Sequence, residues 1–147
     1  MTATGHAIIG TVIAVKVGNP ALAIPLALVS HLAADAFPHW DEGTNSKLKT
    51  KNRLFGEAFF DVIFGFTISY LLVFFLFPQI NILYVFLVVV FAQLPDWITA
   101  PYYFFGIQEF KIFHTLQKKF DNRLDAPWGI INQVAILGLI VALAMIF

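Results

Sequence analysis

Two histidines and two aspartates fall within eleven residues, in the segment HLAADAFPHWD at positions 31–41. An apolar run precedes this segment directly. His31 and Asp35 are four residues apart, so on a helix both side chains project from one face. Glu57 and Asp61 repeat that spacing in a later apolar run. Because imidazole nitrogen and carboxylate oxygen bind zinc, manganese and iron, the two pairs predict a divalent metal site.

The composition of the chain indicates a lipid environment. Hydrophobic residues make up 59% of the 147 residues and charged residues only 12%, whereas a soluble domain carries about 25% charged residues. A chain of this length cannot hide so much apolar surface in its own core. We therefore expect a single integral-membrane domain, 1–147, with membrane lipids as its partners. The zero net charge argues against a nucleic-acid partner, the absence of cysteine excludes thiolate ligands, and the oligomeric state stays open.

The apolar runs divide at prolines, glycines and clusters of charge. They predict six helices, at about 3–17, 21–37, 54–77, 80–97, 107–120 and 127–147. The third, fourth and last reach the ~17–20 residues that a membrane span needs, whereas the first two are marginal. The 107–120 segment has one apolar and one polar face, which is typical of a helix lying in the interface. The fold class expected is an all-α polytopic membrane bundle of about five transmembrane helices and one interfacial amphipathic helix.

The charged residues are distributed unevenly between the two sides of the membrane that these helices would cross. If each expected span crosses, every Asp, Glu and His lies on one side of the membrane, together with every Lys and Arg except Lys16. An excess of basic residues beside short loops marks the cytoplasmic side. The sequence thus predicts a bacterial or archaeal cell-membrane protein with its N-terminus in the cytoplasm and its C-terminus outside.

Several ionisable residues lie at one level, inside or at the ends of apolar runs, where such groups are costly and usually mark function. A divalent cation is a natural partner for buried carboxylates. The expected metal ligands are His6, His31, Asp35, Asp61 and Asp96. His39 and Asp41 lie beyond Pro38 and could either complete the site or decorate a loop. A proton or salt-bridge network, or simple polarity at helix ends, would also place polar groups here.

Three short motifs carry a family resemblance: TGHAIIG near the start, HLAADAFPHWD, and LPDW near position 96. They resemble the predicted integral-membrane metal-dependent hydrolases of the YdjM-like group. A fainter similarity links the His-x-x-x-Asp and Pro-His pattern to zinc-dependent phospholipase C. The resemblance implies a metal-bound hydrolase with His6, His31, Asp35 and Asp96 in matching motifs. The motif order differs, however, and the family's His-Arg-Gly-x-Thr-His-Ser element is missing.

The function expected from these observations is metal-dependent hydrolysis of a lipid or lipid phosphate at the cytoplasmic side. Zinc is the expected metal, with manganese and iron as alternatives. Glu57 is predicted as general base and His114 as general acid. A cation or proton transporter is the main alternative, although few polar residues lie along a route across the membrane. A scaffold without chemistry is the third.

Overall fold

The computed structural model describes all residues, 1–147, and its regular elements are helices. Two single 3₁₀ turns, at Ser46–Leu48 and Gln108–Phe110, accompany the α-helices. The α-helices are α1 (Ala3–Val17), α2 (Pro20–Asp35), α3 (Lys51–Leu76), α4 (Ile82–Phe105), α5 (Lys111–Gln117) and α6 (Trp128–Ile146). The expected all-α fold is confirmed.

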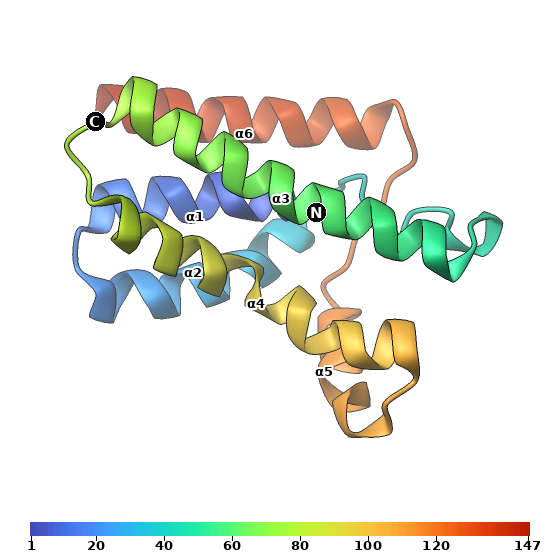
Figure 1. Cartoon of the computed structure of the whole chain (residues 1–147). Helices are drawn as coiled ribbons and strands as arrows, with labels where there is room; N and C mark the ends of the chain where they lie inside the picture. Colours follow the sequence, from blue (N-terminus) through green and yellow to red (C-terminus); the bar gives the residue numbers. More distant parts are fainter.

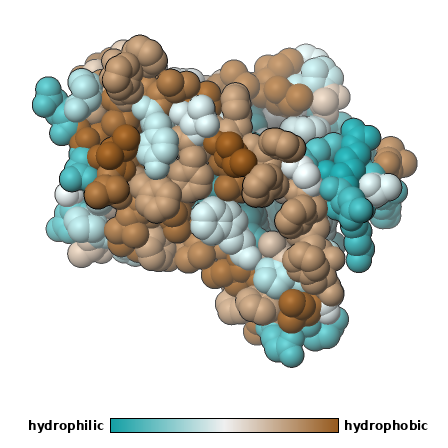
Figure 2. Space-filling view, viewed as in Figure 1, coloured by the Kyte–Doolittle hydropathy of each residue, from teal (hydrophilic) through white to brown (hydrophobic).

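Three helices, α3, α4 and α6, are long and apolar enough to cross a membrane, whereas α1 and α2 have only 15 and 16 residues. Large apolar side chains are exposed along these three helices. Figure 2 shows apolar residues over most of the visible face of the bundle, and a dense group of hydrophilic residues at the end where α3 begins. Such a surface needs lipid around it, so the chain forms a helical membrane bundle.

Helix α1 is the centre of the bundle and packs against α2, α3, α4 and α6. Small residues permit these close approaches. A Cβ atom added at Gly10 would lie 2.8 Å from the Cβ of Ala92 on α4, and one added at Gly65 of α3 would lie 3.1 Å from the Cβ of Ala7. The apolar core around this helix is accordingly made of alanine and valine, namely Ala7, Ala14, Ala23, Ala27, Val73, Val85, Val88, Val89 and Ala92.

The tight turn between α1 and α2 follows the predicted Gly18-Asn19-Pro20 signal. Gly18 adopts a left-handed conformation with φ 64° and ends α1, which glycine does without steric cost. The Asn19 side chain accepts a hydrogen bond from the amide of Ala21, and Pro20 occupies the first position of α2. Figure 1 shows this turn and the α3–α4 turn at one end of the bundle, opposite the loop after α2 and the helix α5.

The largest differences from the expected element boundaries are at the end of α4 and in the interfacial segment. Helix α4 does not end near Trp97 but continues through Pro95 and Pro101 to Phe105. Each proline removes one backbone donor, but packing of α4 against α1, α2 and α5 keeps the helix in place. The interfacial segment is shorter than predicted, with a 3₁₀ turn before the seven-residue helix α5. As a result, Asp96 lies within a helix, and the last turns of α4 extend beyond it.

Candidate metal centre

His31 is fully buried near the C-terminal end of α2, and its ring is held in one orientation. Its Nδ1 lies 2.8 Å from the backbone oxygen of Ala92 on α4. Because a carbonyl oxygen only accepts hydrogen bonds, Nδ1 carries a proton, and Nε2 is the nitrogen that could bind a metal after losing its own proton. The Nε2 atom faces the side chains of Asp35, Asp96 and Gln117. In metal-binding histidines, the ring nitrogen that does not bind the metal usually donates a hydrogen bond to a backbone carbonyl or a carboxylate, which fixes the orientation of the ring.

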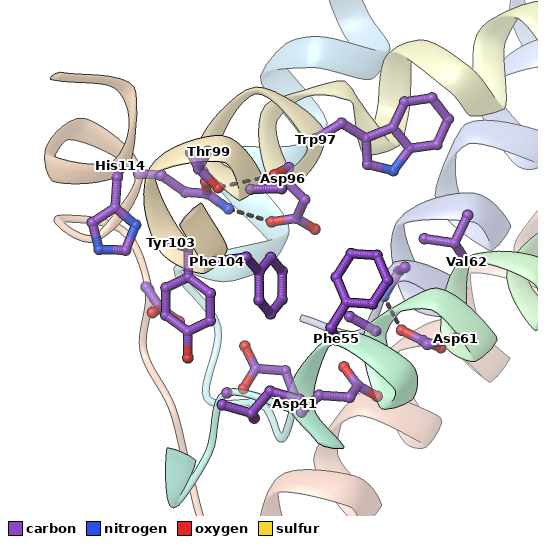
Figure 3. A pocket seen from close by; sticks show the side chains of 18 of the residues that line it. Asp41, Phe55, Asp61, Val62, Asp96, Trp97, Thr99, Tyr103, Phe104 and His114 are labelled. Carbon is purple, nitrogen blue, oxygen red and sulfur yellow. Dashed lines mark hydrogen bonds between the residues drawn. The ribbon is translucent and has the colours of Figure 1, made fainter. Parts of the chain in front are cut away.

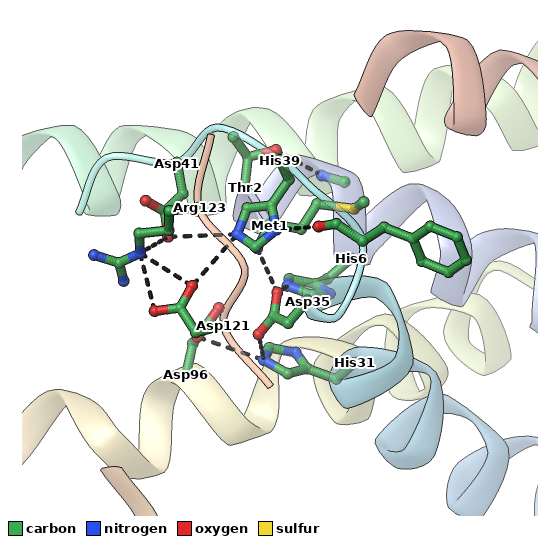
Figure 4. A network of polar contacts seen from close by, with 12 residues as sticks. Met1, Thr2, His6, His31, Asp35, His39, Asp41, Asp96, Asp121 and Arg123 are labelled. Atoms are coloured by element: carbon green, nitrogen blue, oxygen red, sulfur yellow. Dashed lines mark hydrogen bonds and ion pairs between the residues drawn. The ribbon is translucent and has the colours of Figure 1, made fainter. Parts of the chain in front are cut away.

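His6 of α1 lies face to face with His31, with ring centroids 3.7 Å apart and planes 15° from parallel. Its Nε2 is 3.1 Å from one oxygen of Asp35, and the other oxygen of Asp35 is 3.4 Å from Nε2 of His31. Asp96 of α4 places an oxygen 3.5 Å from the same Nε2 of His31. The amino group of Met1 also contacts Asp35. We refer to His6, His31, Asp35 and Asp96 as the first cluster (Figure 4).

The first cluster brings together donor atoms that could bind a divalent metal ion. In a tetrahedral site with bonds of about 2.0–2.1 Å, the ligand atoms lie about 3.3–3.4 Å from one another. Three contacts within the cluster, at 3.1, 3.4 and 3.5 Å, are close to this spacing, although His6 and His31 contact different oxygens of Asp35. Single donor atoms of His6, His31 and Asp96 also lie within 4.8 Å of one another. Two neutral imidazoles and two carboxylates would balance the charge of one divalent cation.

Asp61, a predicted ligand, lies outside the first cluster, at the start of α1. Its carboxylate accepts hydrogen bonds from the backbone amides of Ala3 and Thr4 and, at 2.6 Å, from the Thr4 hydroxyl. A carboxylate at a helix N-terminus satisfies amides that lack intrahelical partners and interacts favourably with the helix dipole. Asp61 thus joins α3 to α1.

Glu57, the predicted general base, is held by two basic residues. Its carboxylate oxygens lie 2.7 Å from Nζ of Lys49 and 2.7 Å from Nε of Arg53. The structure does not bring Glu57 to the first cluster. The spacing of Glu57 and Asp61 does place both on one face of α3, but that face meets the start of α1 and the preceding loop.

A cavity of about 260 Å³ lies beside the first cluster, between α3, α4, α5 and the loop segments (Figure 3). Asp96 contributes to its wall from the first cluster. Apolar rings of Phe55, Phe59 and Phe104 line another part, and both Phe55 and Phe59 are also exposed on the outer surface of α3. The cavity therefore combines a polar wall with an apolar side that faces the lipid.

His114, the predicted general acid, also lines this cavity, from α5. Its ring lies beside those of Tyr102 and Tyr103, at centroid distances of 5.2 and 5.8 Å. Burial lowers the pKa of His114, and the nearby charges of Lys118 and Arg123 lower it further. The imidazole is therefore neutral at pH 7 and able to accept a proton.

His39 and Asp41 join a different group of side chains, which also borders the cavity. With Asp121 they form a set whose donor atoms lie within 4.8 Å of one another. We refer to His39, Asp41 and Asp121 as the second cluster (Figure 4). Burial lowers the pKa of His39, but the nearby carboxylates of Asp121 and Asp41 outweigh this and raise the pKa to about 9.

The sequence analysis did not identify three residues of this region as site residues: Gln117, Asp121 and Arg123. The Gln117 amide contacts both Nε2 of His31 and, at 2.5 Å, a carboxylate oxygen of Asp96. Asp121 and Arg123 lie in an irregular segment after α5, where no periodicity fixes the direction of a side chain. The only available signal was the concentration of charge in DNRLD at 121–125.

Comparison of the chain with protein-family models, curated proteins and solved structures gave no match. A function is therefore inferred from the two clusters and the cavity.

Proposed function

We propose that this protein is a membrane-embedded, metal-dependent hydrolase that acts on an ester bond of a lipid or lipid phosphate. The observation that carries the proposal is the first cluster, in which donor atoms of His6, His31 and Asp96 from three helices lie within 4.8 Å of one another, with Asp35 in contact with both histidines. Zinc suits this nitrogen and oxygen donor set best, and manganese and iron are alternatives.

A metal ion bound there would lower the pKa of a water molecule to about 7 and polarise the scissile group. The residues of the chain have supporting roles. The backbone oxygen of Ala92 holds His31 in the tautomer that binds metal. The amide of Gln117 orients the carboxylate of Asp96 by a hydrogen bond. Such contacts fix the ligands before the metal arrives.

The cavity supports a lipid as the substrate class. An acyl chain could lie against Phe55, Phe59 and Phe104, where α3 faces the membrane, with its polar end beside Asp96. Ligand sites of this kind are mainly apolar with a few convergent polar groups.

We assign proton transfer to His114 rather than to Glu57. His114 lines the cavity, and its lowered pKa keeps it neutral and able to accept a proton from water at pH 7. Glu57 is instead engaged by Lys49 and Arg53. A general base of this kind typically contributes about 100- to 10,000-fold in rate.

The test combines metal analysis with an activity screen on the purified protein in detergent. Wild type should contain a divalent metal and release product from phospholipids or lipid phosphates in a chelator-sensitive manner. Asp96→Asn should lose both, whereas Asp125→Asn, an exposed carboxylate change, should lose neither. Folded wild type that contains no metal and hydrolyses none of these lipids would refute the proposal.

A cation or proton transporter is the second candidate, and one observation favours it. Gln93 of α4 is fully buried, and neither polar atom of its side chain has a hydrogen-bond partner. Thr11 and Ser69, also fully buried, lie in the same bundle and both donate to the carbonyl of Ala7. Buried polar groups inside a bundle mark ion pathways in many membrane proteins. Metal or proton flux into proteoliposomes, abolished by Gln93→Leu, would support transport over hydrolysis.

A further inference from the structure

The second cluster is assembled by backbone pairing between two irregular segments. The amide of His39 donates to the carbonyl of Asn122, and the amide of Leu124 donates to the carbonyl of His39. The amide of Asn122 donates to the carbonyl of Asp35, in the last turn of α2. These bonds tie the second cluster to the end of the helix that carries two residues of the first. The two clusters are consequently neighbours in a fixed arrangement (Figure 4).

His39 is oriented like a metal ligand. Its ring is fully buried, and its Nδ1 lies 2.8 Å from the backbone oxygen of Phe37, so Nδ1 carries a proton. The remaining nitrogen, Nε2, has no hydrogen-bond partner of good geometry. It faces oxygens of Asp121 at 3.5 Å and Asp41 at 3.9 Å. A buried nitrogen without a hydrogen bond is costly, and an ion between the three groups would remove that cost.

The carboxylates of the second cluster already attract a cation of the chain itself. Nε of Arg123 lies 3.2 Å from Asp41 and 3.0 Å from Asp121. The Arg123 side chain is 36% exposed and borders the cavity. It can therefore turn toward the cavity when another cation takes its place. One oxygen of Asp41 is engaged by Thr44, which leaves the other for a cation.

The charges around the cavity favour cations as well. Its wall bears five carboxyl groups but only two basic side chains. The carboxyl groups belong to Asp41, Glu42, Asp61, Asp96 and Asp121, and the basic groups to Lys118 and Arg123. An anionic headgroup would be repelled from such a wall unless metal ions first offset its charge. Burial raises the pKa of Glu42 to about 8, so at most four of these carboxyl groups are charged at pH 7 and the excess is about two negative charges. One divalent ion at the first cluster would cancel this excess, and a second would make the wall positive.

We propose that His39, Asp41 and Asp121 form a second divalent-cation site, which borders the same cavity as the first cluster and which Arg123 occupies as a displaceable internal cation. The site provides one nitrogen and two carboxylates, a donor set that suits zinc or manganese. Cation binding at this site does not depend on the hydrolysis proposed above. With both sites filled, the cavity accepts an anionic headgroup, which makes a lipid phosphate the favoured substrate.

The first measurement is binding stoichiometry on full-length protein in detergent, stripped with chelator and then equilibrated with zinc. Wild type should bind two equivalents. Asp121→Asn and His31→Gln should each bind one, and Asp125→Asn should bind two. If wild type binds a single equivalent that Asp121→Asn keeps and His31→Gln loses, the second site is refuted while the first stands. If wild type binds none, both are refuted.

The second measurement uses Arg123→Gln, which removes the competing cation. In chelator this variant should melt at a lower temperature than wild type, because Asp41 and Asp121 then repel each other. Added zinc should restore its melting temperature, and its affinity for the second equivalent should exceed that of wild type by about tenfold or more, the equivalent of 1.4 kcal/mol. A melting temperature that zinc does not restore would show that the second cluster only forms ion pairs with Arg123 and binds no metal, which would overturn the proposal.

Discussion

His6 and His31 stack face to face at 3.7 Å, on two different helices, and the carboxylate of Asp35 contacts both rings. Like charges at that distance repel strongly in a buried setting, so the pair favours at most one protonated ring in the absence of metal. A bound divalent ion would avoid this repulsion, because metal ligands are neutral imidazoles. Since the rings are nearly parallel, one of them must turn out of the stack for both to bind the same ion.

His6→Phe separates metal binding from packing. A phenyl ring can keep the stacking contact with His31 but removes the contact between His6 and Asp35, so stability in chelator should fall by about 1–3 kcal/mol. The ligand nitrogen is lost, and bound metal should fall by one equivalent. Elemental analysis and thermal melting test both parts; full metal content in a folded variant would remove His6 from the ligand set.

Asp61→Ala should affect stability without affecting metal content. The side chain satisfies the amide groups at the start of α1 and is absent from the first cluster. Loss of such a helix cap costs about 0.5–2 kcal/mol. We expect a lower melting temperature with an unchanged metal-to-protein ratio. If metal is lost in the variant while its fold is retained, Asp61 is a ligand after all.

Glu57→Gln should leave turnover nearly unchanged. The Glu57 carboxylate pairs with half-buried Lys49 and exposed Arg53 near the surface of the protein, where ion pairs contribute little to stability. Steady-state assays beside wild type measure the effect. A loss of 100-fold or more, with metal and fold intact, would return the general-base role to Glu57.

The pH dependence of hydrolysis should report His114. Burial and the charges of Lys118 and Arg123 lower its pKa, so the base form persists below pH 6.5. The rate constant kcat/KM should therefore rise with pH on an acidic limb that lies below pH 6.5 and stay high at neutral pH. His114→Gln should abolish this limb and lower the rate. For the same reason, stability from this group is present above pH 6.5 and decreases as the pH falls through the lowered pKa.

Membrane orientation can be tested with reporter fusions. The basic residues of the 44–51 loop predict, by the positive-inside rule, that this loop lies in the cytoplasm. A reporter inserted there should be active inside, and one fused after Phe147 should be active outside. Opposite signals would show that the bundle has the reverse orientation in the membrane. Two reporters active on the same side would mean that one helix does not span.

The sequence by itself determined the class of fold and much of the first cluster. Long apolar runs in a chain with few charges can only be buried in lipid, and strong turn signals such as Gly18-Asn19-Pro20 separate the helices. The His31–Asp35 spacing follows from helical geometry alone, because residues four apart share a face whatever surrounds them. The sequence also predicted that they lie at the same membrane depth as His6 and Asp96, because consecutive helices cross the bilayer in opposite directions.

Only the tertiary structure decided which faces meet. Glu57 and Asp61 share a face of α3, yet that face contacts the start of α1 and the loop before α3 rather than the first cluster. The rotation of a helix about its axis is set by packing, here by the small residues around α1. Asp121 and Arg123 meet His39 and Asp41 only because backbone hydrogen bonds join two irregular segments some 80 residues apart in the chain. No local pattern encodes such a pairing, since it depends on where α2 and α5 end in space.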